Sequence, residues 1–205
     1  MELVAQGLCV ERGERRVIGG LGLRVGAGEV LIVTGVNGAG KSTLLRALAG
    51  LLVPAAGTIL LGAHRRDGDA HAYTGQLHYL GHRDAVKGAL TVAQNLAYWQ
   101  EVLAPAETRA PAAEALAAFG LEGLASMPAA YLSAGLRRRL ALTRLLAVPR
   151  PLWLLDEPAA GLDAPSRAAL GDAIGRHCAG GGLAVVASHG ELSLPAAQTL
   201  ALERA

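Results

Sequence analysis

The chain has 205 residues, of which 52% are apolar, and its formal net charge at pH 7 is +2. This length predicts one compact domain with room for a subdomain, because single domains commonly span roughly 100–200 residues. The small net charge argues against a nucleic-acid partner, and no apolar run reaches the roughly 18–20 residues of a membrane-spanning helix. The first residues contain no basic segment followed by an apolar one, so we predict no secretory signal and expect the chain in the cytosol.

Buried strands are predicted to alternate with helices along much of the chain. The run GEVLIVTG at residues 28–35 is apolar, β-branched and bounded by glycines, which indicates a buried strand. Residues 41–52 then predict a helix with one apolar face, formed by Leu44, Leu48, Leu51 and Leu52. Two more buried strands are expected at 151–158 and 181–189, with helical sequence between them. This alternation predicts an α/β fold with a parallel sheet.

Two other regions have a different pattern. Residues 1–28 alternate polar and apolar side chains between glycine turns, which predicts short antiparallel strands. Residues 90–148 are rich in Ala and Leu at helical spacing, and Pro105 and Pro111 mark a loop within them. We therefore expect a β region, a parallel core and a helical insert.

The segment GVNGAGKST matches the pattern G-x-x-x-x-G-K-[ST] and lies between a predicted strand and a predicted helix, the context in which this motif binds phosphate. Its nine residues are Gly35, Val36, Asn37, Gly38, Ala39, Gly40, Lys41, Ser42 and Thr43. The glycines let the backbone curl so that successive N–H groups point at phosphate oxygens, and the helix N-terminus adds a favourable dipole. We expect Lys41 to reach the β- and γ-phosphates of ATP and the Ser42 hydroxyl to ligate Mg²⁺.

Acidic residues follow the later strands. Asp156 ends an apolar strand, and we expect its carboxylate to hold Mg²⁺ through water. Glu157 follows directly, and a carboxylate beside the γ-phosphate can polarise the attacking water, so Glu157 is our candidate general base. His189, at the end of the next strand, can contact the γ-phosphate and order that water, although a strand-end histidine alone is also common as an ordinary residue. Asp163 begins a turn into a helix and says little by itself.

The stretch YLSAGLRRRL supplies another motif. Leu132, Ser133, Ala134 and Gly135 resemble the signature segment of ATP-binding-cassette (ABC) ATPases, and the P-loop, signature, LLDEP, GLD turn and SH segments occur in the order of that family. The resemblance covers essentially the whole chain. In that family two nucleotide domains pair head to tail, and the signature of one caps the γ-phosphate held by the P-loop of the other. It therefore implies a homodimer in which Asp163 belongs to the D-loop.

The same resemblance implies the fold and its subdivision. We expect a P-loop NTPase of the ABC type, with a mostly parallel core sheet, an N-terminal antiparallel β subdomain and an α-helical subdomain. Residues 1–205 would form one ABC ATPase domain. Within it, residues of about 1–89 and 149–205 would form the nucleotide-binding core with the β subdomain, and about 90–148 the helical subdomain with the signature motif.

The residues after the signature are basic. Arg137, Arg138 and Arg139 lie in the first turns of a predicted helix, where the helix dipole favours acidic residues. Either an anion or acidic neighbour across the dimer compensates for the unfavourable interaction of these arginines with the helix dipole, or the arginines form a solvated basic face.

A finer resemblance appears in residues 79–99, which are similar to the GH…K…LT…NL segment of the haem-exporter ATP-binding subunit of the cytochrome c maturation system. The Ala of LSAG and the segments RRRLALTRL and PLWLLDEP resemble the same subunit. Arg12 appears where many cassettes stack a tyrosine on adenine, and a guanidinium can stack on a purine face. This resemblance implies binding to integral membrane subunits at the cytoplasmic face of a bacterial inner membrane, with hydrolysis driving haem delivery by releasing a haem-loaded chaperone.

Haem itself would be handled only indirectly, through the complex. His64, His71, His78 and His82 are close in sequence, but we expect surface and loop histidines rather than haem ligands. Cys9 and Cys178 have no metal-ligand spacing and are expected to be packing residues.

Two positions depart from the family pattern. Arg83 aligns with a glutamine that contacts Mg²⁺ and the coupling region in cassettes, and Leu136 replaces the glutamine that normally ends the signature. Arginine can neither accept a hydrogen bond nor bind a cation, so Mg²⁺ geometry or coupling to the membrane partner is expected to differ. Lys41, Asp156 and Glu157 are unchanged, so we expect a working ATPase, although slow turnover is compatible with these changes.

Three other functions remain open at this point. The chain could be the ATPase of another small importer or exporter, or a soluble cassette ATPase acting on ribosomes or DNA. The latter usually carry two cassettes in one chain or a long coiled-coil insert, and neither is present here. The two replaced glutamines also suggest a regulatory subunit that binds ATP without turnover, against which Glu157 argues.

Overall fold

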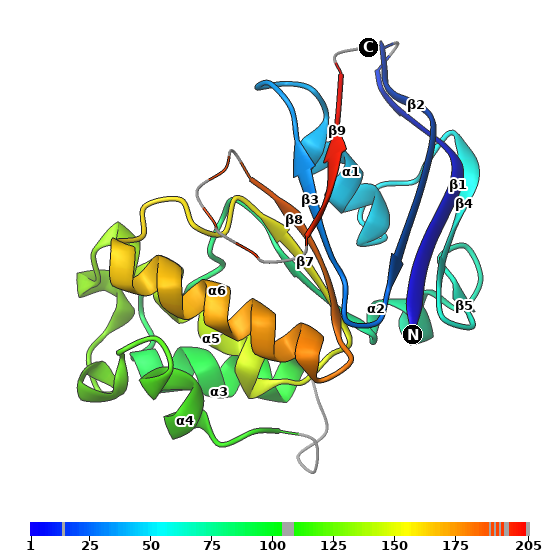
Figure 1. Ribbon diagram of the computed structural model, residues 1–205. Coiled ribbons are helices and arrows are strands. Elements are labelled where there is room, and N and C mark those ends of the chain that lie inside the picture. Colours follow the sequence, from blue (N-terminus) through cyan, green and yellow to red (C-terminus); the bar gives the residue numbers. More distant parts are fainter. Residues whose placement is uncertain are drawn as a thin grey trace.

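Figure 1 presents a computed structural model of the chain, in which two sheets lie beside a group of helices. The structure describes residues 1–13, 15–103, 109–188, 190, 192, 194 and 197–203. Two residues singled out above, Pro105 and His189, lie outside this range.

The first sheet is antiparallel and has the strand order β2-β1-β4-β5. Its strands are β1 (Glu2–Arg12), β2 (Arg15–Gly26), β4 (Ala56–Leu61) and β5 (His64–Arg65). The antiparallel strands predicted in residues 1–28 are confirmed, but they are longer than expected, with 11 and 12 residues. Irregular register shifts interrupt the pairing of β1 with β2, and such bulges let a long strand bend around a core.

The second sheet has the order β6-β7-β8-β3-β9, and all of its pairings are parallel. Its strands are β3 (Val30–Thr34), β6 (Leu77–Leu80), β7 (Leu152–Asp156), β8 (Leu183–Ala187) and β9 (Gln198–Ala201). Every residue of β7 and β8 is buried, as expected for central strands covered on both faces. The predicted strands at 28–35, 151–158 and 181–189 and the predicted α/β class are confirmed, whereas β6 and β9 were not predicted.

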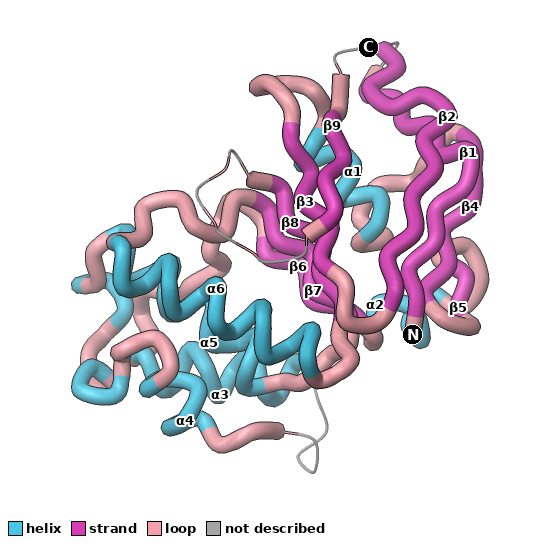
Figure 2. The backbone as a smooth tube through the Cα atoms, in the orientation of Figure 1, coloured by secondary structure: helices cyan, strands magenta, loops and turns pink. Residues whose placement is uncertain are grey.

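Helices cover both faces of the parallel sheet (Figure 2). They are α1 (Lys41–Leu48), α2 (Ala70–Thr74), α3 (Val92–Leu103), α4 (Ala112–Ala117), α5 (Ala134–Ala147) and α6 (Ala164–Ala179), with short 3₁₀ turns at Glu122–Leu124 and Ala129–Tyr131. Leu152 and Leu154 of β7 join the core with α1 and the antiparallel sheet. Trp153 and Leu155 join the core with α5 and α6 on the other face, because successive strand residues point to opposite sides.

The helix after the P-loop is shorter than predicted. We expected it to continue to residue 52, but α1 ends at Leu48. Gly50 has φ of +76°, and the N–H groups of Gly50 and Leu51 donate to the carbonyls of Ala47 and Arg46. These two bonds form a Schellman motif, which closes a helix at a left-handed glycine. The prediction that Leu51 continues the apolar face is wrong, since its side chain is 64% exposed.

Within the described part of the chain, none of the helices combines the length and the apolar character that a bilayer crossing demands.

One of the four histidines differs from the prediction. His71 and His82 are exposed and His64 is partly exposed, but His78 on β6 is buried. Its Nε2 lies 2.7 Å from the Val148 carbonyl, so this nitrogen carries the proton and donates. Burial lowers the pKa of His78 to about 3, and the side chain is therefore neutral in the folded protein.

We predict that His78 makes stability depend on pH. Its pKa is lower in the folded chain than in the unfolded chain, where it is about 6.5, so the unfolded chain binds more protons as pH falls below 6.5. The contribution is present above that pH and is progressively lost toward the folded pKa of about 3. Between pH 7 and pH 5 the loss is about 2 kcal/mol.

Urea unfolding at pH 5, 6 and 7 measures this effect. His78→Gln keeps an N–H donor for the Val148 carbonyl. Between pH 7 and pH 5 its free energy of unfolding should fall by about 2 kcal/mol less than that of the wild type. His71→Gln, at an exposed position, is the control and should keep the wild-type dependence. Equal pH dependence in wild type and His78→Gln would contradict the assignment.

Candidate functional site

The loop between β3 and α1 folds back over the side chain of Lys41. Lys41 Nζ donates to the Gly35 carbonyl at 2.7 Å, and the side chain is only 6% exposed. Gly40 caps α1 in the left-handed region with φ of +102°. The first helical N–H groups and the lysine ammonium therefore lie together at the start of α1, where a helix favours an anion.

Two glycines of this loop have no room for a side chain. A Cβ on Gly35 would lie 2.5 Å from the Leu202 carbonyl oxygen, and a Cβ on Gly40 would lie 2.8 Å from Val17 Cγ1. Both residues also have positive φ, which side chains disfavour. The loop can therefore pack against Val17 and Leu202 only with glycine at these two positions.

Ser42 and Asp156 meet although they are 114 positions apart in the sequence. Ser42 Oγ donates to Asp156 Oδ1 at 3.0 Å, and Asp156 is 2% exposed. A hydroxyl and a carboxylate are oxygen ligands of the kind that Mg²⁺ takes together with substrate phosphates. Among the described residues, no group of three or more His, Cys, Asp or Glu side chains is placed to hold a metal. The pair suits a cation that is shared with a phosphate.

Glu157 borders the same cavity as the P-loop. The cavity has a volume of about 420 Å³ and is lined by Arg12, Val17, Asn37, Gly38, Gly40, Lys41, Ser42, Thr43 and Glu157. Glu157 has φ of +47°, which is unusual for a residue with a side chain. Its N–H donates to the Ala187 carbonyl at the end of β8. The structure therefore brings Arg12 and Glu157 to the predicted phosphate loop, while the predicted contribution of His189 lies outside the described residues.

The signature residues form a separate cavity. Ser133 caps α5, with its Oγ accepting from the Leu136 N–H at 3.3 Å. Ser133 and Gly135 line a cavity of about 230 Å³ with Gly161 and Asp163. A Cβ on Gly135 would lie 3.0 Å from the Gly161 carbonyl oxygen, so the start of α5 packs closely on the turn that precedes Asp163. The described lining of this cavity contains no P-loop residue.

Asp163 has a local structural role as well. It caps α6, with Oδ1 accepting from the Ser166 N–H at 2.9 Å. Hydrogen bonding to the Ser166 side chain, and then to its N–H, lowers the pKa of the Asp163 carboxyl. The side chain therefore stays ionised at neutral pH, next to the signature cavity. Leu132, before the cap, is buried, whereas Ala134 in the first turn is exposed.

The three arginines after the signature were expected to face an anion or acidic residue across a dimer, or to be solvated, and both alternatives are wrong for Arg138. Arg137 is exposed, but Arg138 is only 5% exposed and donates to carbonyl oxygens at the end of β7. Its acidic partner is Asp84 of the same chain, at 2.9 Å, and not a residue across a dimer. Arg139 donates to the Phe119 carbonyl at 3.2 Å. Sequence reasoning missed Arg138 because its acceptors are mostly backbone carbonyls far away in the chain.

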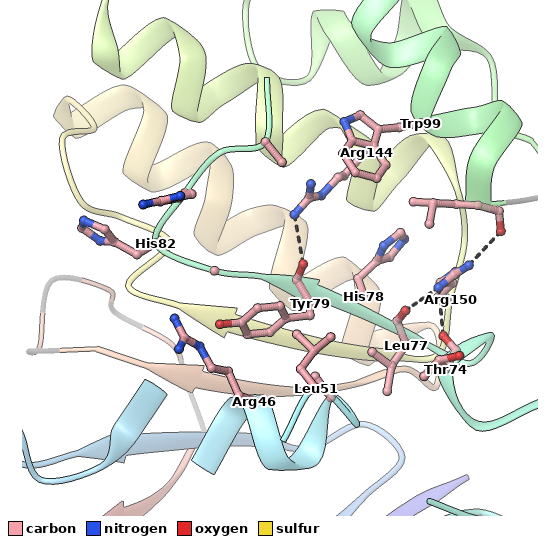
Figure 3. Close-up of a pocket in the computed structure, with 15 residues that line it drawn as sticks. Arg46, Leu51, Thr74, Leu77, His78, Tyr79, His82, Trp99, Arg144 and Arg150 are labelled. Carbon is pink, nitrogen blue, oxygen red and sulfur yellow. Dashed lines mark hydrogen bonds between the residues drawn. The ribbon is translucent and has the colours of Figure 1, made fainter. Parts of the chain in front are cut away.

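A third cavity, of about 600 Å³, lies along β6 (Figure 3). Arg144 from α5 donates to the Tyr79 carbonyl at 3.0 Å and lies over the ring of Trp99. Burial lowers the pKa of Arg144 to about 10. Arg83 lines this cavity and not the P-loop cavity. No pattern in the sequence predicted the cavity along β6.

Comparison with known proteins identifies the family. A family model described as ABC transporter matches residues 18–160. The chain belongs to this family. It is accordingly an ABC-type ATPase subunit, and the predicted P-loop NTPase fold of that type is confirmed.

Similar proteins extend over nearly the whole chain. A protein of Rhodopseudomonas palustris strain BisB5 named cytochrome c biogenesis ATP-binding export protein CcmA is 50% identical over 196 residues, which cover 96% of each chain. A protein of the same name from Rhodospirillum rubrum is 47% identical, covering 96% of this chain and 83% of the relative. Another, from Paramagnetospirillum magneticum, is 46% identical over 98% of this chain and 93% of its own.

Solved structures have the same fold. One titled as the ATP binding subunit of an ABC transporter superposes with a TM-score of 0.83 at 26% identity, covering 92% of this chain and 80% of its own. A putative ABC transporter ATP-binding protein from Pyrococcus furiosus has a TM-score of 0.83 over 98% of both chains. Its identity of 23% supports the fold alone.

We predict that Gly40→Ala weakens ATP binding by at least about tenfold, because the added Cβ meets Val17 and the positive φ is unfavourable for alanine. Titration of a fluorescent ATP analogue in the presence of Mg²⁺ measures the affinity. Gly20→Ala also has a positive φ but nothing within 4 Å of its Cβ, and it should keep the affinity within about twofold. Unchanged affinity in Gly40→Ala would contradict the role of this loop in binding ATP.

Proposed function

We propose that this chain is the ATP-hydrolysing subunit of a membrane export complex that serves haem delivery in cytochrome c biogenesis. The observation that carries the proposal is the near-full-length similarity, at 46–50% identity, to relatives named as ATP-binding export proteins of that process. The geometry of the P-loop cavity is consistent with this function. The ammonium group of Lys41, the candidate metal ligands Ser42 and Asp156, and the carboxylate of Glu157 lie in or next to it.

The P-loop would bind the phosphates of ATP, with Lys41 pairing with the β- and γ-phosphates. Ser42 and Asp156 would hold Mg²⁺, which neutralises charge on the phosphates when bound. Glu157 would accept a proton from the attacking water, and His189 would help to order that water. Arg12, which also lines the cavity, would stack on the adenine ring.

Two copies of the chain would complete the site. The signature residues line a cavity separate from the P-loop cavity, so within one chain Ser133 is not among the groups that surround the phosphate loop. In a head-to-tail homodimer, residues 132–135 of one copy would cap the γ-phosphate bound by the other. Asp163, beside the signature, would lie at the same contact.

The partners would be integral membrane subunits, and the ATPase would be peripheral at the cytoplasmic face of the bacterial inner membrane. Haem would be moved or released by the complex, with no nucleic acid involved. Arg83 lines the large cavity along β6, away from the P-loop cavity, which supports an effect on coupling to a partner rather than on Mg²⁺.

We also propose the subdivision of the domain. Residues of about 90–148 would form the helical subdomain, since α3, α4 and α5 share an apolar core of their own. Residues of about 1–89 and 149–205 would form the nucleotide-binding core with the antiparallel β subdomain.

The experiment replaces the gene in the source organism with a Glu157→Gln version. We expect loss of the covalently haem-stained bands of membrane c-type cytochromes, because removing a general base costs about 100-fold or more in rate. Other haem proteins should be unaffected. Glu122→Gln, at an exposed position on a 3₁₀ turn, is the matched control and should leave the bands intact.

ATP turnover by the purified chain separates the alternatives. An active wild type that loses turnover in Glu157→Gln, while c-type cytochromes remain stained even in a full deletion, would indicate an ATPase of another transporter. A wild-type chain that binds ATP without hydrolysis would favour the regulatory subunit suggested by Arg83 and Leu136.

A further inference from the structure

The guanidinium of Arg138 uses all of its donors at one place. Nε donates to the Pro158 carbonyl at 3.1 Å. One terminal nitrogen donates to the Gly81 carbonyl and to Asp84 Oδ1, at 3.0 and 2.9 Å. The other donates to the carbonyls of Asp156 and Glu157, at 3.0 and 2.7 Å. An arginine carries five N–H donors, so each one has an acceptor.

Three of these acceptors are consecutive carbonyls around Glu157. This residue has φ of +47°, a conformation that a side chain disfavours and that persists only where its surroundings fix it. The N–H of Glu157 is held by the Ala187 carbonyl and its carbonyl by Arg138. The position of Glu157 at the P-loop cavity therefore depends on two hydrogen bonds of its backbone, one to the Ala187 carbonyl of β8 and one from the Arg138 side chain of α5.

The other two acceptors belong to the segment that follows β6. Gly81 and Asp84 connect that strand to the helices, and the Asp84 side chain is 26% exposed. Arg138 is almost completely buried between this segment and the end of β7. A buried guanidinium whose donors are all engaged holds its partners in a fixed relative geometry.

Arg138 also lies on the helix that begins at the signature. Ser133 caps α5, and Arg138 is in the second turn of that helix. The helix thus connects the cap, which would meet ATP on a second copy, with the backbone of the candidate general base. A shift of α5 or of residues 81–84 would move the guanidinium that holds the Glu157 carbonyl.

We propose that Arg138 is a positioning residue for hydrolysis, which sets the backbone of Glu157, and that Asp84 in turn orients Arg138. The inference rests on the proposed function, in which Glu157 activates water. Arg138 does not line the P-loop cavity, so it would affect the chemical step and not the binding of ATP.

Steady-state hydrolysis by the full chain tests this proposal. Lysine has three donors on a single nitrogen and cannot span these acceptors, so Arg138→Lys should lower kcat by about 10- to 100-fold. KM for ATP and the affinity for a fluorescent ATP analogue should stay within about threefold. Arg176→Gln, an exposed arginine on α6, is the control and should retain wild-type kinetics.

A second comparison distinguishes positioning from general loss of structure. If Arg138 acts through Glu157, Arg138→Lys should cause no more than about a twofold further loss when it is added to Glu157→Gln. Asp84→Asn, at a partly exposed position, removes the charge that orients Arg138 and should lower kcat about threefold or more with KM unchanged. This variant decides the question if Arg138→Lys does not fold.

Wild-type kcat in Arg138→Lys, or in Asp84→Asn where Arg138→Lys does not fold, would overturn the inference. The inference would also be overturned if kcat/KM fell only through a rise in KM, with kcat unchanged. A large further loss of kcat when Arg138→Lys is added to Glu157→Gln would overturn it too. An inactive wild type, or one insensitive to Glu157→Gln, would instead contradict the proposed function.

Discussion

The parallel pairing of β6, β7, β8 and β3 is the constraint on which the site depends. Parallel strands end at the same edge of a sheet, so residues that follow them meet although they are far apart in sequence. The P-loop follows β3, Asp156 ends β7, and Ala187 ends β8. Because β7 and β8 are buried in full, this edge is held by the same apolar packing that stabilises the core.

Polar bonds then fix positions within this frame. Ser42 joins the P-loop to Asp156, and the Ala187 carbonyl holds the N–H of Glu157. On the other side, two arginines of α5 donate to strand carbonyls, Arg138 to Asp156 at the end of β7 and Arg144 to Tyr79 of β6. Each buried guanidinium would be costly without acceptors, and most of the acceptors are backbone carbonyls in or next to the strands. Hydrogen bonds therefore join the signature helix directly to the sheet.

The sequence predicted the parts whose signal is local. A run such as LIVTG and the glycines of the P-loop are read from neighbouring residues, and the strands β3, β7 and β8 lie where expected. The antiparallel strands and the helices α5 and α6 were also recognisable from periodicity. In contrast, α1 ends because Gly50 has a left-handed φ. A single glycine within a helical pattern does not predict such a conformation.

Sequence reasoning failed where a polar side chain is buried by distant contacts. His78 is neutral because it is buried, and its ring nitrogen bonds the carbonyl of Val148, which lies 70 positions later. Arg138 was expected either to face an anion or acidic neighbour across a dimer or to be solvated, yet its acceptors lie 18 to 57 positions away, between Gly81 and Pro158. The large cavity along β6 likewise combines residues from several elements (Figure 3). Such pairings depend on the tertiary fold, which no short motif encodes.

The most direct test of the account is the structure of Glu157→Gln crystallised with Mg²⁺ and ATP. We predict two copies with the triphosphate between residues 35–43 of one and residues 132–135 of the other, with Ser42 and Asp156 at the metal. The adenine should lie against Arg12. Nucleotide bound outside the P-loop cavity, or a triphosphate that no second copy contacts, would contradict it.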